Sequence, residues 1–521
     1  MPSGFKNRSR LLIPVLLPLL IMIGAAVWGR DFGYHWDESK MVPLIRGTIR
    51  TGTFLSGWYR YPSMTYWLNL LGLLPYTVGV FLRGDADIAA LQAYLIDVAG
   101  GDIFNLQVRT IFIIVSSLSV LWVYLLILLW KNRNWAEALL AASFLALSWE
   151  VGYHLRWIAP DAILMQFGAL TIMFAFLAVQ GEKSRYWVWA SAVAAGLGMG
   201  TKYPGGLLLV PVLIAAYRVK NRHGWGLILE VVLAFLGAYL LSTPGTLLEM
   251  RVFLHDVTSE VTHYQAGHYG YSLSPVEHFR LMGVYFSQVV FSHYPLLALF
   301  IFSLSLVGTY VLFEESRQDA LLLLSFPGLY VLFFGFQRVM IVRNLLVLIP
   351  FLAVLSARGW FFLWQQLKNR SLRSLWAAAI VGVLVVNALW LAHSADTIRK
   401  RGSGIFVREF IASVRKEPES QFFISDKLWR EIVLLDEAPP PNTLNEFSEH
   451  VDMVALYASE GMEQPTDWPR NKPGLVTKIF GPWETNFDYY PTWAGDDRIL
   501  VMPLEKAQEL NLNVIRNHSN E

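Results

Sequence analysis

Long apolar runs separated by short polar segments fill the chain as far as residue 393. An α-helix needs roughly 20 mostly apolar residues to cross a bilayer, and on this criterion the pattern predicts about eleven transmembrane helices. The predicted spans are residues 11–29, 108–130, 135–149, 162–179, 186–199, 206–217, 226–241, 294–312, 321–336, 344–355 and 375–391. The membrane part of the chain is therefore predicted to belong to the α class, as a polytopic helical protein.

The apolar stretch 64–82 is predicted to lie at the membrane surface instead of crossing the bilayer. Cytoplasmic loops are enriched in Lys and Arg, and counting this stretch as a span would place Lys131 and Arg133 outside. Pro75 and the neighbouring aromatic residues also suit a helix in the interface. Residues 30–107 are therefore predicted to form one large outer loop that contains an interfacial helix.

Three basic residues, Lys6, Arg8 and Arg10, precede the first apolar run and place the N-terminus in the cytoplasm. The run is too long for a usual signal peptide and lacks a clear cleavage site, so we expect it to be retained as the first span. Asp37 and Glu38 then emerge on the outer face. Carboxylates beside a bilayer are costly unless they face water, a cation or a reacting group, which makes this pair a candidate site.

The pattern changes in the last part of the chain, where charges are frequent and long apolar runs stop. Residues 407–414 and 428–435 have helical periodicity, whereas 421–424, 475–479 and 498–502 read as strands. The structure of residues 442–474 is left open. We predict a transmembrane domain over residues 1–393 and a small α/β domain outside the membrane over 394–521, which we expect to position the acceptor and not to perform chemistry.

The composition excludes several classes of protein. The chain is 55% hydrophobic and 16% charged, which is too apolar for an ordinary soluble protein. A net charge of +2 without a basic stripe argues against a nucleic-acid binder. The absence of cysteine excludes disulfides and thiolate metal sites.

Cations also gather on the predicted outer side, at the ends of spans. They are Arg60, Arg156, Lys202, Arg338 and Arg343. Cations that merely flank a membrane prefer the cytoplasmic side, so outer cations indicate another role. A cluster of Arg and Lys is typical of a site that holds a phosphate.

A carboxylate pair beside such cations matches sugar transfer from a phosphate-linked donor. One carboxylate takes the proton of the acceptor hydroxyl while the cations neutralise the departing phosphate, and we predict Asp37 as this base. Simpler interpretations stay open: Arg156 and Asp161 form a local ion pair, and Lys202 extends its amine to the interface. The loosely spaced histidines of residues 243–292 leave a divalent cation as an alternative, with the metal unknown.

A transporter or flippase of a lipid-linked anion is the competing class of function, because it would also need outer cations. Such a protein alternates access and places polar residues at mid-membrane and on the inner side. The predicted spans are nearly uncharged and show no internal repeat. The pattern therefore favours an enzyme.

Several motifs in residues 10–360 together resemble the integral-membrane, polyprenyl-phosphate-sugar-dependent glycosyltransferases of GT-C fold, the family 39 group. This group includes protein O-mannosyltransferases and the bacterial aminoarabinose transferase of lipid A. The motifs are Asp37-Glu38, Arg60-Tyr61-Pro62 before Tyr66 to Asn69, Arg156 to Asp161, Gly198 to Tyr203, Gly267-His268, and Arg343-Asn344 with Pro350. The chain departs from the group where Tyr61 replaces a lysine or other polar residue and Asn344 a tyrosine.

The resemblance implies a GT-C fold and a role for each matched residue. The roles are catalysis for Asp37, Glu38 and Asp161; binding of the donor phosphate for Arg60, Arg156, Lys202 and Arg343; and binding of substrate for Tyr61, His268 and Arg338. The expected partners are a polyprenyl-phosphate sugar and membrane lipid. The acceptor is expected to be a lipid, a glycan or a protein on the outer face of the membrane, with its identity and that of the sugar unassigned. The expected location is the inner (plasma) membrane, with the site facing the periplasm or the exterior.

Overall fold

A computed structural model describes residues 12–32, 38–84, 87–130, 134–181, 183–266, 272–400, 403–434, 438–446, 448, 450–457, 478–480 and 499–509. The chain forms two compact units. The first comprises residues 1–30, 37–268 and 272–395, and the second comprises residues 31–36, 269–271 and 396–521.

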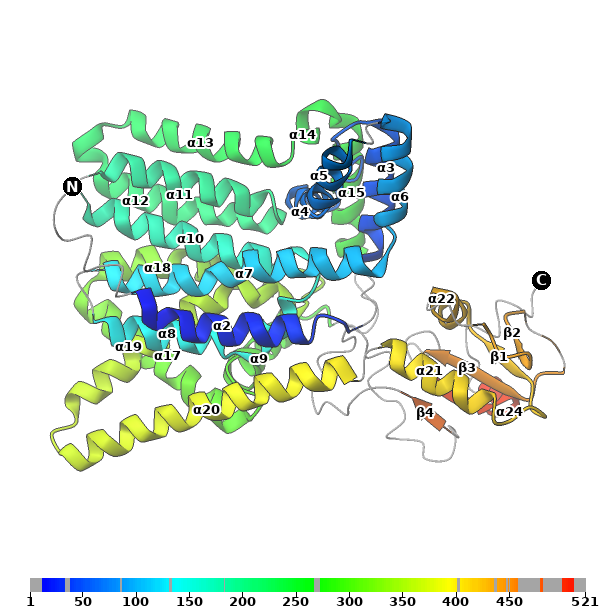
Figure 1. Cartoon of the computed structure of the whole chain (residues 1–521). Helices are drawn as coiled ribbons and strands as arrows, with labels where there is room; N and C mark the ends of the chain where they lie inside the picture. The colour runs from blue at the N-terminus through cyan, green and yellow to red at the C-terminus, as the bar shows by residue number, and fades with distance from the viewer. Residues whose placement is uncertain are drawn as a thin grey trace. The chain divides into compact units, whose positions relative to one another are not determined.

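Each span predicted from the sequence is a helix in the first unit. These helices are α2 (Ile13–Trp28), α7 (Asp102–Leu129), α8 (Trp135–Ala146), α10 (Pro160–Gln180), α11 (Ser184–Met199), α12 (Leu209–His223), α13 (Gly226–Ser242), α17 (Pro295–Glu315), α18 (Arg317–Gly335), α19 (Ile349–Gln366) and α20 (Arg370–Lys400). Most of them run side by side as a bundle (Figure 1). The predicted polytopic helical fold is therefore confirmed.

Seven helical stretches of the described residues are long and apolar enough to cross a membrane, and Met64–Arg83 is one of them. This stretch is divided into α4 (Met64–Leu71) and α5 (Leu74–Arg83). Both helices lie at one end of the bundle with α3 (Met41–Thr51) and α6 (Ile88–Val98), where α7 begins (Figure 1). Its place at the membrane surface stays a prediction. We call this end of the bundle the site end.

Further helices, most of them short, connect the helices of the bundle. They are η2 (Glu38–Lys40), α9 (Trp149–His154), η3 (Tyr203–Leu208), α14 (Gly245–Leu248), α15 (Met250–Ala266), α16 (Pro275–Val284), η4 (Tyr285–Val289) and η5 (Val342–Leu348). Of these, η2, η3 and η5 are 3₁₀ helices, and η4 is a π-helix. Turns of the 3₁₀ kind are frequent as connectors, whereas a π-helix is rare and often occurs at a functional site.

Two glycines allow α17 and α19 to pack closely. A Cβ atom added at Gly308 would collide with the carbonyl oxygen of Leu355, and one at Gly359 with that of Leu304. Small residues at helix crossings are typical of membrane bundles, because lipid gives apolar side chains little reason to associate and close backbone packing replaces that driving force. The bundle therefore depends on backbone contact at this crossing.

The second unit contains a five-stranded sheet of order β2-β1-β3-β5-β4. Its elements are α21 (Ser403–Val414), β1 (Phe422–Ile424), α22 (Asp426–Leu434), β2 (Thr443–Leu444), β3 (Met453–Tyr457), β4 (Lys478–Phe480), β5 (Ile499–Pro503) and α24 (Leu504–Glu509). Strand β1 is parallel to β2 and β3, whereas β5 is antiparallel to β3 and β4. The predicted α/β class is confirmed.

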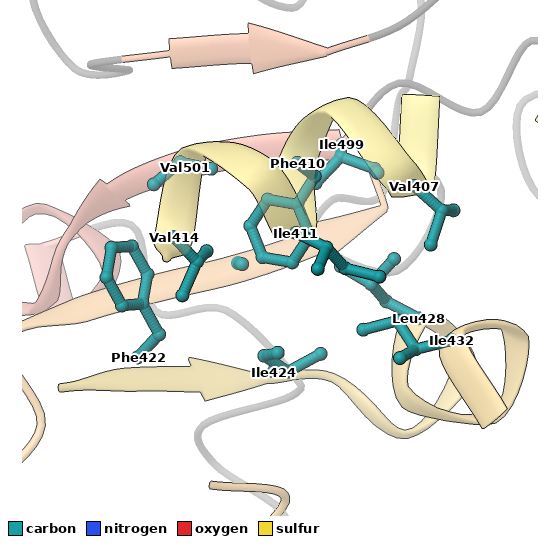
Figure 2. Packing of buried hydrophobic residues seen from close by; sticks show 11 residues of the cluster. Val407, Phe410, Ile411, Val414, Phe422, Ile424, Leu428, Ile432, Ile499 and Val501 are labelled. Atoms are coloured by element: carbon teal, nitrogen blue, oxygen red, sulfur yellow. The ribbon is translucent and has the colours of Figure 1, made fainter. Parts of the chain in front are cut away.

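Alternating side chains give this sheet two apolar faces. Phe422 and Ile424 of β1 pack with α21 and α22 on one face, as Figure 2 shows, whereas Phe423 packs in the cluster on the other face. Ile499 and Leu500 of β5 divide in the same way. A period of two places successive side chains on opposite faces, so both faces are buried in apolar layers. The described core of this unit is thus apolar and serves stability.

Candidate functional site at one end of the bundle

Four polar side chains from three separate segments meet at the site end. Asp161 lies in the first turn of α10, Lys202 lies just before η3, and Arg343 and Asn344 lie in η5. Asp161 Oδ1 accepts a hydrogen bond from Lys202 Nζ at 2.7 Å, and Lys202 Nζ also donates to Asn344 Oδ1 at 2.5 Å. The second carboxylate oxygen of Asp161 is 3.9 Å from Arg343 Nε. We call these residues the Asp161 cluster.

The Asp161 cluster holds more positive than negative charge. All four side chains are buried, and among the contacts of the described residues the two cations Lys202 and Arg343 both pair with the carboxylate of Asp161. Asn344 Nδ2 has no hydrogen-bond partner in the part of the chain that the structure describes. Buried charge and unpaired donors are costly unless an opposite group compensates them, so this arrangement suits an anion.

Aromatic rings lie beside both cations. The ring of Tyr61 is centred 5.9 Å from Lys202 Nζ, and the ring of Trp157 is 5.7 Å from the guanidinium carbon of Arg343. The negative face of an aromatic ring attracts a cation and limits the positions that it can take. Tyr61 therefore joins the residues that the structure brings together.

Glu38, the second carboxylate of the predicted pair, is bound by Arg109 and by a backbone N–H group. Its carboxylate is buried, accepts two hydrogen bonds from Arg109 of α7 and accepts a third from the backbone N–H of Ile158 at 3.0 Å. These bonds tie the start of the first loop to α7 and to the segment before α10. Its neighbour Asp37 lies outside the described residues.

Arg109 is a site residue that the sequence analysis missed. It is 3% exposed, and it also donates to the carbonyl oxygen of Arg30 at 2.8 Å. The available signal was a single arginine near the start of a 28-residue apolar helix. A charge in such a position is costly and indicates a function or a buried partner.

Arg156 lies between α9 and α10, and its side chain reaches the C-terminal end of α2. It is 1% exposed and donates to the carbonyl oxygens of Ala25 and Ala26, both at 3.4 Å. Burial lowers the pKa of Arg156 to about 10, so the side chain stays charged at neutral pH. The alternative of a local pair with Asp161 is not formed in the described structure, and Nη1 of Arg156 has no hydrogen-bond partner there.

The remaining predicted site residues are exposed or lie outside the residues that the structure describes. Arg60 is exposed and makes no hydrogen bond or ion pair within the described part of the chain. Arg338 is also exposed and donates to the carbonyl oxygen of Gln265 at 2.9 Å, which fixes the end of α15. His268 lies outside the described residues.

The loop that carries Arg60 and Tyr61 is anchored on its neighbours. The backbone N–H of Tyr59 donates to Asp256 at 2.7 Å, and Tyr203 donates to the carbonyl oxygen of Tyr59 at 2.6 Å. The Tyr59 hydroxyl donates to Glu249. Burial and this carboxylate raise the pKa of Tyr59, so the hydroxyl keeps its proton and the anchor holds.

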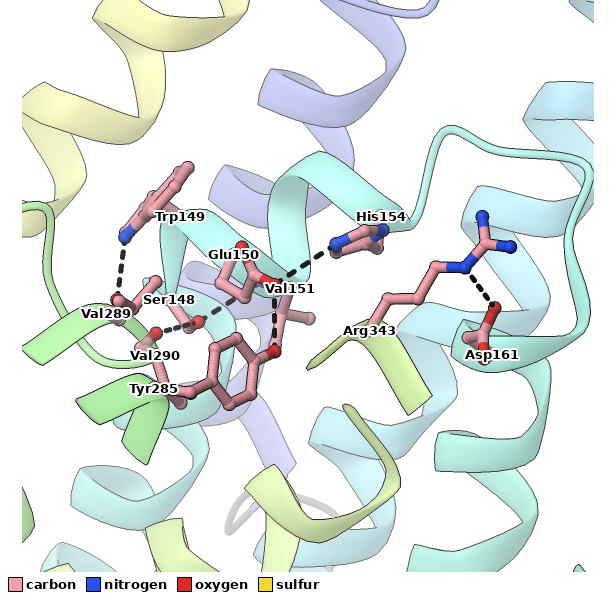
Figure 3. Close-up of polar contacts among 10 residues, drawn as sticks. All are labelled: Ser148, Trp149, Glu150, Val151, His154, Asp161, Tyr285, Val289, Val290 and Arg343. Carbon is pink, nitrogen blue, oxygen red and sulfur yellow. Dashed lines mark hydrogen bonds and ion pairs between the residues drawn. The ribbon is translucent and has the colours of Figure 1, made fainter. Parts of the chain in front are cut away.

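A second buried group, also missed from the sequence, lies on the helix before Asp161. Glu150 and His154 are four residues apart on α9, and Tyr285 begins η4. Figure 3 shows both His154 and Tyr285 directed at the Glu150 carboxylate. The i, i+4 spacing next to the Arg156 to Asp161 motif was the available signal. We call these three residues the Glu150 cluster.

Within the described ranges, no three His, Asp or Glu side chains gather in a way that would hold a metal ion. Asp37 and His268 are not among those ranges. The divalent cation considered above therefore stays an untested alternative.

The family model for dolichyl-phosphate-mannose-protein mannosyltransferases matches residues 88–245, which include Asp161 and Lys202. Among solved structures, ArnT from Cupriavidus metallidurans in the apo state is similar over 97% of this chain and 99% of its own, with 12% identity and a TM-score of 0.51. The archaeal oligosaccharyltransferase AglB from Archaeoglobus fulgidus is similar over 88% of this chain and 70% of its own, with 11% identity and a TM-score of 0.50. None of the curated proteins compared with the chain matches it.

These similarities agree with the fold that the resemblance implied. Identities this low carry information about the fold alone, and the GT-C fold and the resemblance to membrane glycosyltransferases of that fold are confirmed. The chain is a multi-pass membrane protein.

Proposed function

We propose that the protein is a glycosyltransferase that moves a monosaccharide from a polyprenyl-phosphate-linked donor to an acceptor hydroxyl. The observation that carries this proposal is the Asp161 cluster, in which two buried cations share one carboxylate. The excess positive charge suits a phosphate group, and its position in a membrane bundle suits a phosphate carried by a lipid. The family match over residues 88–245 supports this reading.

Lys202 and Arg343 bind the donor phosphate in this proposal. Asp161 holds both cations in place, and Tyr61 and Trp157 limit their movement. The exposed Arg60 attracts the anionic headgroup before it enters the site. Arg156, whose Nη1 has no hydrogen-bond partner within the described structure, adds a further positive charge at the site end.

The reaction is a single displacement. Asp37 takes the proton of the acceptor hydroxyl, the resulting oxygen attacks the anomeric carbon, and the bond from that carbon to the phosphate oxygen breaks. Polyprenyl phosphate leaves with its negative charge stabilised by Lys202 and Arg343, and the configuration of the sugar inverts. The assignment of Asp37 comes from the sequence, where the Asp37-Glu38 pair follows the first span and resembles the first-loop acidic motif of the family 39 group. Glu38, the other member of the pair, is held by Arg109 and by the backbone N–H of Ile158.

The complex of AglB with an inhibitory peptide and a dolichol-phosphate shows that a protein of this fold holds a lipid phosphate. We extend that type of donor to this chain and propose that its site faces the periplasm or exterior of the plasma membrane. No described feature favours the competing transporter, because the charged residues of the Asp161 cluster lie at helix ends and not along a path through the bundle.

The test is incubation of purified protein in liposomes with a polyprenyl-phosphate sugar that is radiolabelled in the sugar. An enzyme releases polyprenyl phosphate and passes the label to an acceptor or, more slowly, to water. Movement of intact labelled lipid across the bilayer without release of the sugar would overturn the proposal and establish a transporter.

A further inference from the structure

The Glu150 cluster is buried near the proposed phosphate site, and no step of the reaction above uses it. Glu150 is 0% and His154 is 2% exposed. A carboxylate removed from water is costly to the fold unless hydrogen bonds and nearby positive charge compensate it. An apolar residue would fill the same space at less cost, so the position of this carboxylate requires a functional account.

Two hydrogen bonds fix the geometry of the Glu150 cluster. Oε1 of Glu150 accepts from the Tyr285 hydroxyl at 2.8 Å and pairs with His154 Nε2 at 3.1 Å. A carboxylate only accepts hydrogen bonds, so Nε2 of His154 carries the hydrogen. Glu150 thereby fixes the orientation of the His154 ring.

The segment around Glu150 is itself held against the π-helix. The Ser148 side chain caps α9 and donates to the carbonyl oxygen of Val290 at 2.5 Å, and Trp149 Nε1 donates to that of Val289 at 2.8 Å. These bonds, drawn in Figure 3, connect α9 to η4 and to the residue that follows it. Glu150 and Tyr285 therefore lie on connected backbones.

Contacts lead from His154 to the donor site. The ring of His154 packs edge-on against Trp157, with 4.4 Å between the ring centroids, and the guanidinium of Arg343 lies over the same Trp157. Trp157 is 2% exposed, so the contacts around it determine where its ring lies. A shift of His154 would move the surface against which Arg343 rests.

We propose that Glu150 and Tyr285 are positioning residues, which hold Arg343 through His154 and Trp157 in the orientation that binds the donor phosphate. This inference rests on the proposed function, because the contact between Arg343 and the donor phosphate is part of that proposal. The direction in which neutralisation of Glu150 changes the affinity for an anion distinguishes a positioning role from a purely electrostatic one. Glu150 is negative, so by charge alone its neutralisation would strengthen the binding of an anion, whereas loss of positioning weakens it.

The experiment measures the affinity of purified protein for polyprenyl phosphate. Glu150→Gln keeps the size of the side chain and is expected to weaken binding by about tenfold, because a misplaced contact loses much of its effect. Tyr285→Phe removes one hydrogen bond without changing charge and should weaken binding in the same direction by less. In an Arg343→Gln background, Glu150→Gln should change the affinity by less than about twofold, since the residue it positions is gone.

A matched control is Glu137→Gln, which neutralises another buried carboxylate, one that lies beside Arg358 and is 5% exposed. It should leave the affinity unchanged, and thermal unfolding checks that each variant is folded. Equal or tighter binding by Glu150→Gln, or an equal loss in both backgrounds, would overturn the inference, whereas the proposed function would still stand if the wild type transfers or releases the labelled sugar. A wild-type protein that does not bind polyprenyl phosphate would overturn both.

Discussion

The two ends of the helix bundle bury charge in different ways. At the end opposite the site end, Arg358 is paired with two carboxylates, Glu137 and Glu315, and Arg218 lies 3.0 Å from Asp319. There the carboxylates equal or outnumber the cations. At the site end, Glu38 compensates Arg109 in the same way. In the Asp161 cluster, however, two buried cations pair with one carboxylate, and the buried guanidinium of Arg156 bonds only to backbone carbonyl oxygens within the described structure.

The difference separates structural ion pairs from a binding site. A pair that only joins helices compensates its own charge, because an unpaired charge inside a protein costs several kcal/mol. A set of side chains with excess charge gains stability when a ligand of opposite sign arrives.

The largest effect is expected from Asp37→Asn. An asparagine cannot accept the proton of the acceptor hydroxyl, and loss of a general base typically slows turnover by about a hundredfold to ten-thousandfold. Binding of the donor should persist, since the cations remain. Single-turnover assays over a range of protein concentrations measure both quantities, because the concentration dependence of the rate gives the donor affinity and the limiting rate gives the turnover. Lost donor binding together with normal turnover of the bound fraction would remove Asp37 from the role of base.

Glu38→Gln should act on the fold more than on the chemistry. The substitution leaves the buried guanidinium of Arg109 without its carboxylate, which typically costs about 3–5 kcal/mol of stability. Thermal unfolding should show the loss, and the folded fraction should keep most of its turnover. Wild-type stability with abolished turnover would instead make Glu38 a participant in the reaction.

The smallest effect is expected at an exposed pair, Arg185 with Glu230, whose charged atoms are 2.7 Å apart and whose side chains are 56% and 32% exposed. Exposed pairs contribute at most about 1 kcal/mol, because water and salt screen them. Arg185→Gln should therefore leave unfolding and donor affinity nearly unchanged. A large loss of affinity would contradict the division between the two ends.

The sequence predicts the bundle well and its connections poorly. A span must be apolar along its whole length, so composition alone locates long apolar helices such as α7, α10 and α17. The short helix α9 and the π-helix η4 have no such constraint, since contacts between distant segments determine them. In the second unit, β3 lies within residues 442–474, whose structure the sequence did not predict. Its pairing with neighbouring strands, and not its own periodicity, makes it the central strand of the sheet.

The same limit applies to the candidate site. The sequence placed Asp161, Lys202 and Arg343 on one side of the membrane, and the structure brings them into contact. It did not indicate that Arg156 lies at the end of α2 or that Glu38 pairs with Arg109, which is 71 residues away. Residue type and side of the membrane follow from local patterns, whereas the choice of partner depends on how the helices pack.

The most direct test of the account is a titration of polyprenyl phosphate against three proteins: the wild type, Arg343→Gln at the site end and Arg218→Gln at the opposite end. Removal of one charge-assisted hydrogen bond costs roughly 1.5–3 kcal/mol, which is about a tenfold to hundredfold loss of affinity. We predict saturable binding to the wild type and to Arg218→Gln with equal affinity, and at least a tenfold loss in Arg343→Gln. Equal affinity in all three proteins would contradict the claim that the excess charge at the site end binds the donor phosphate.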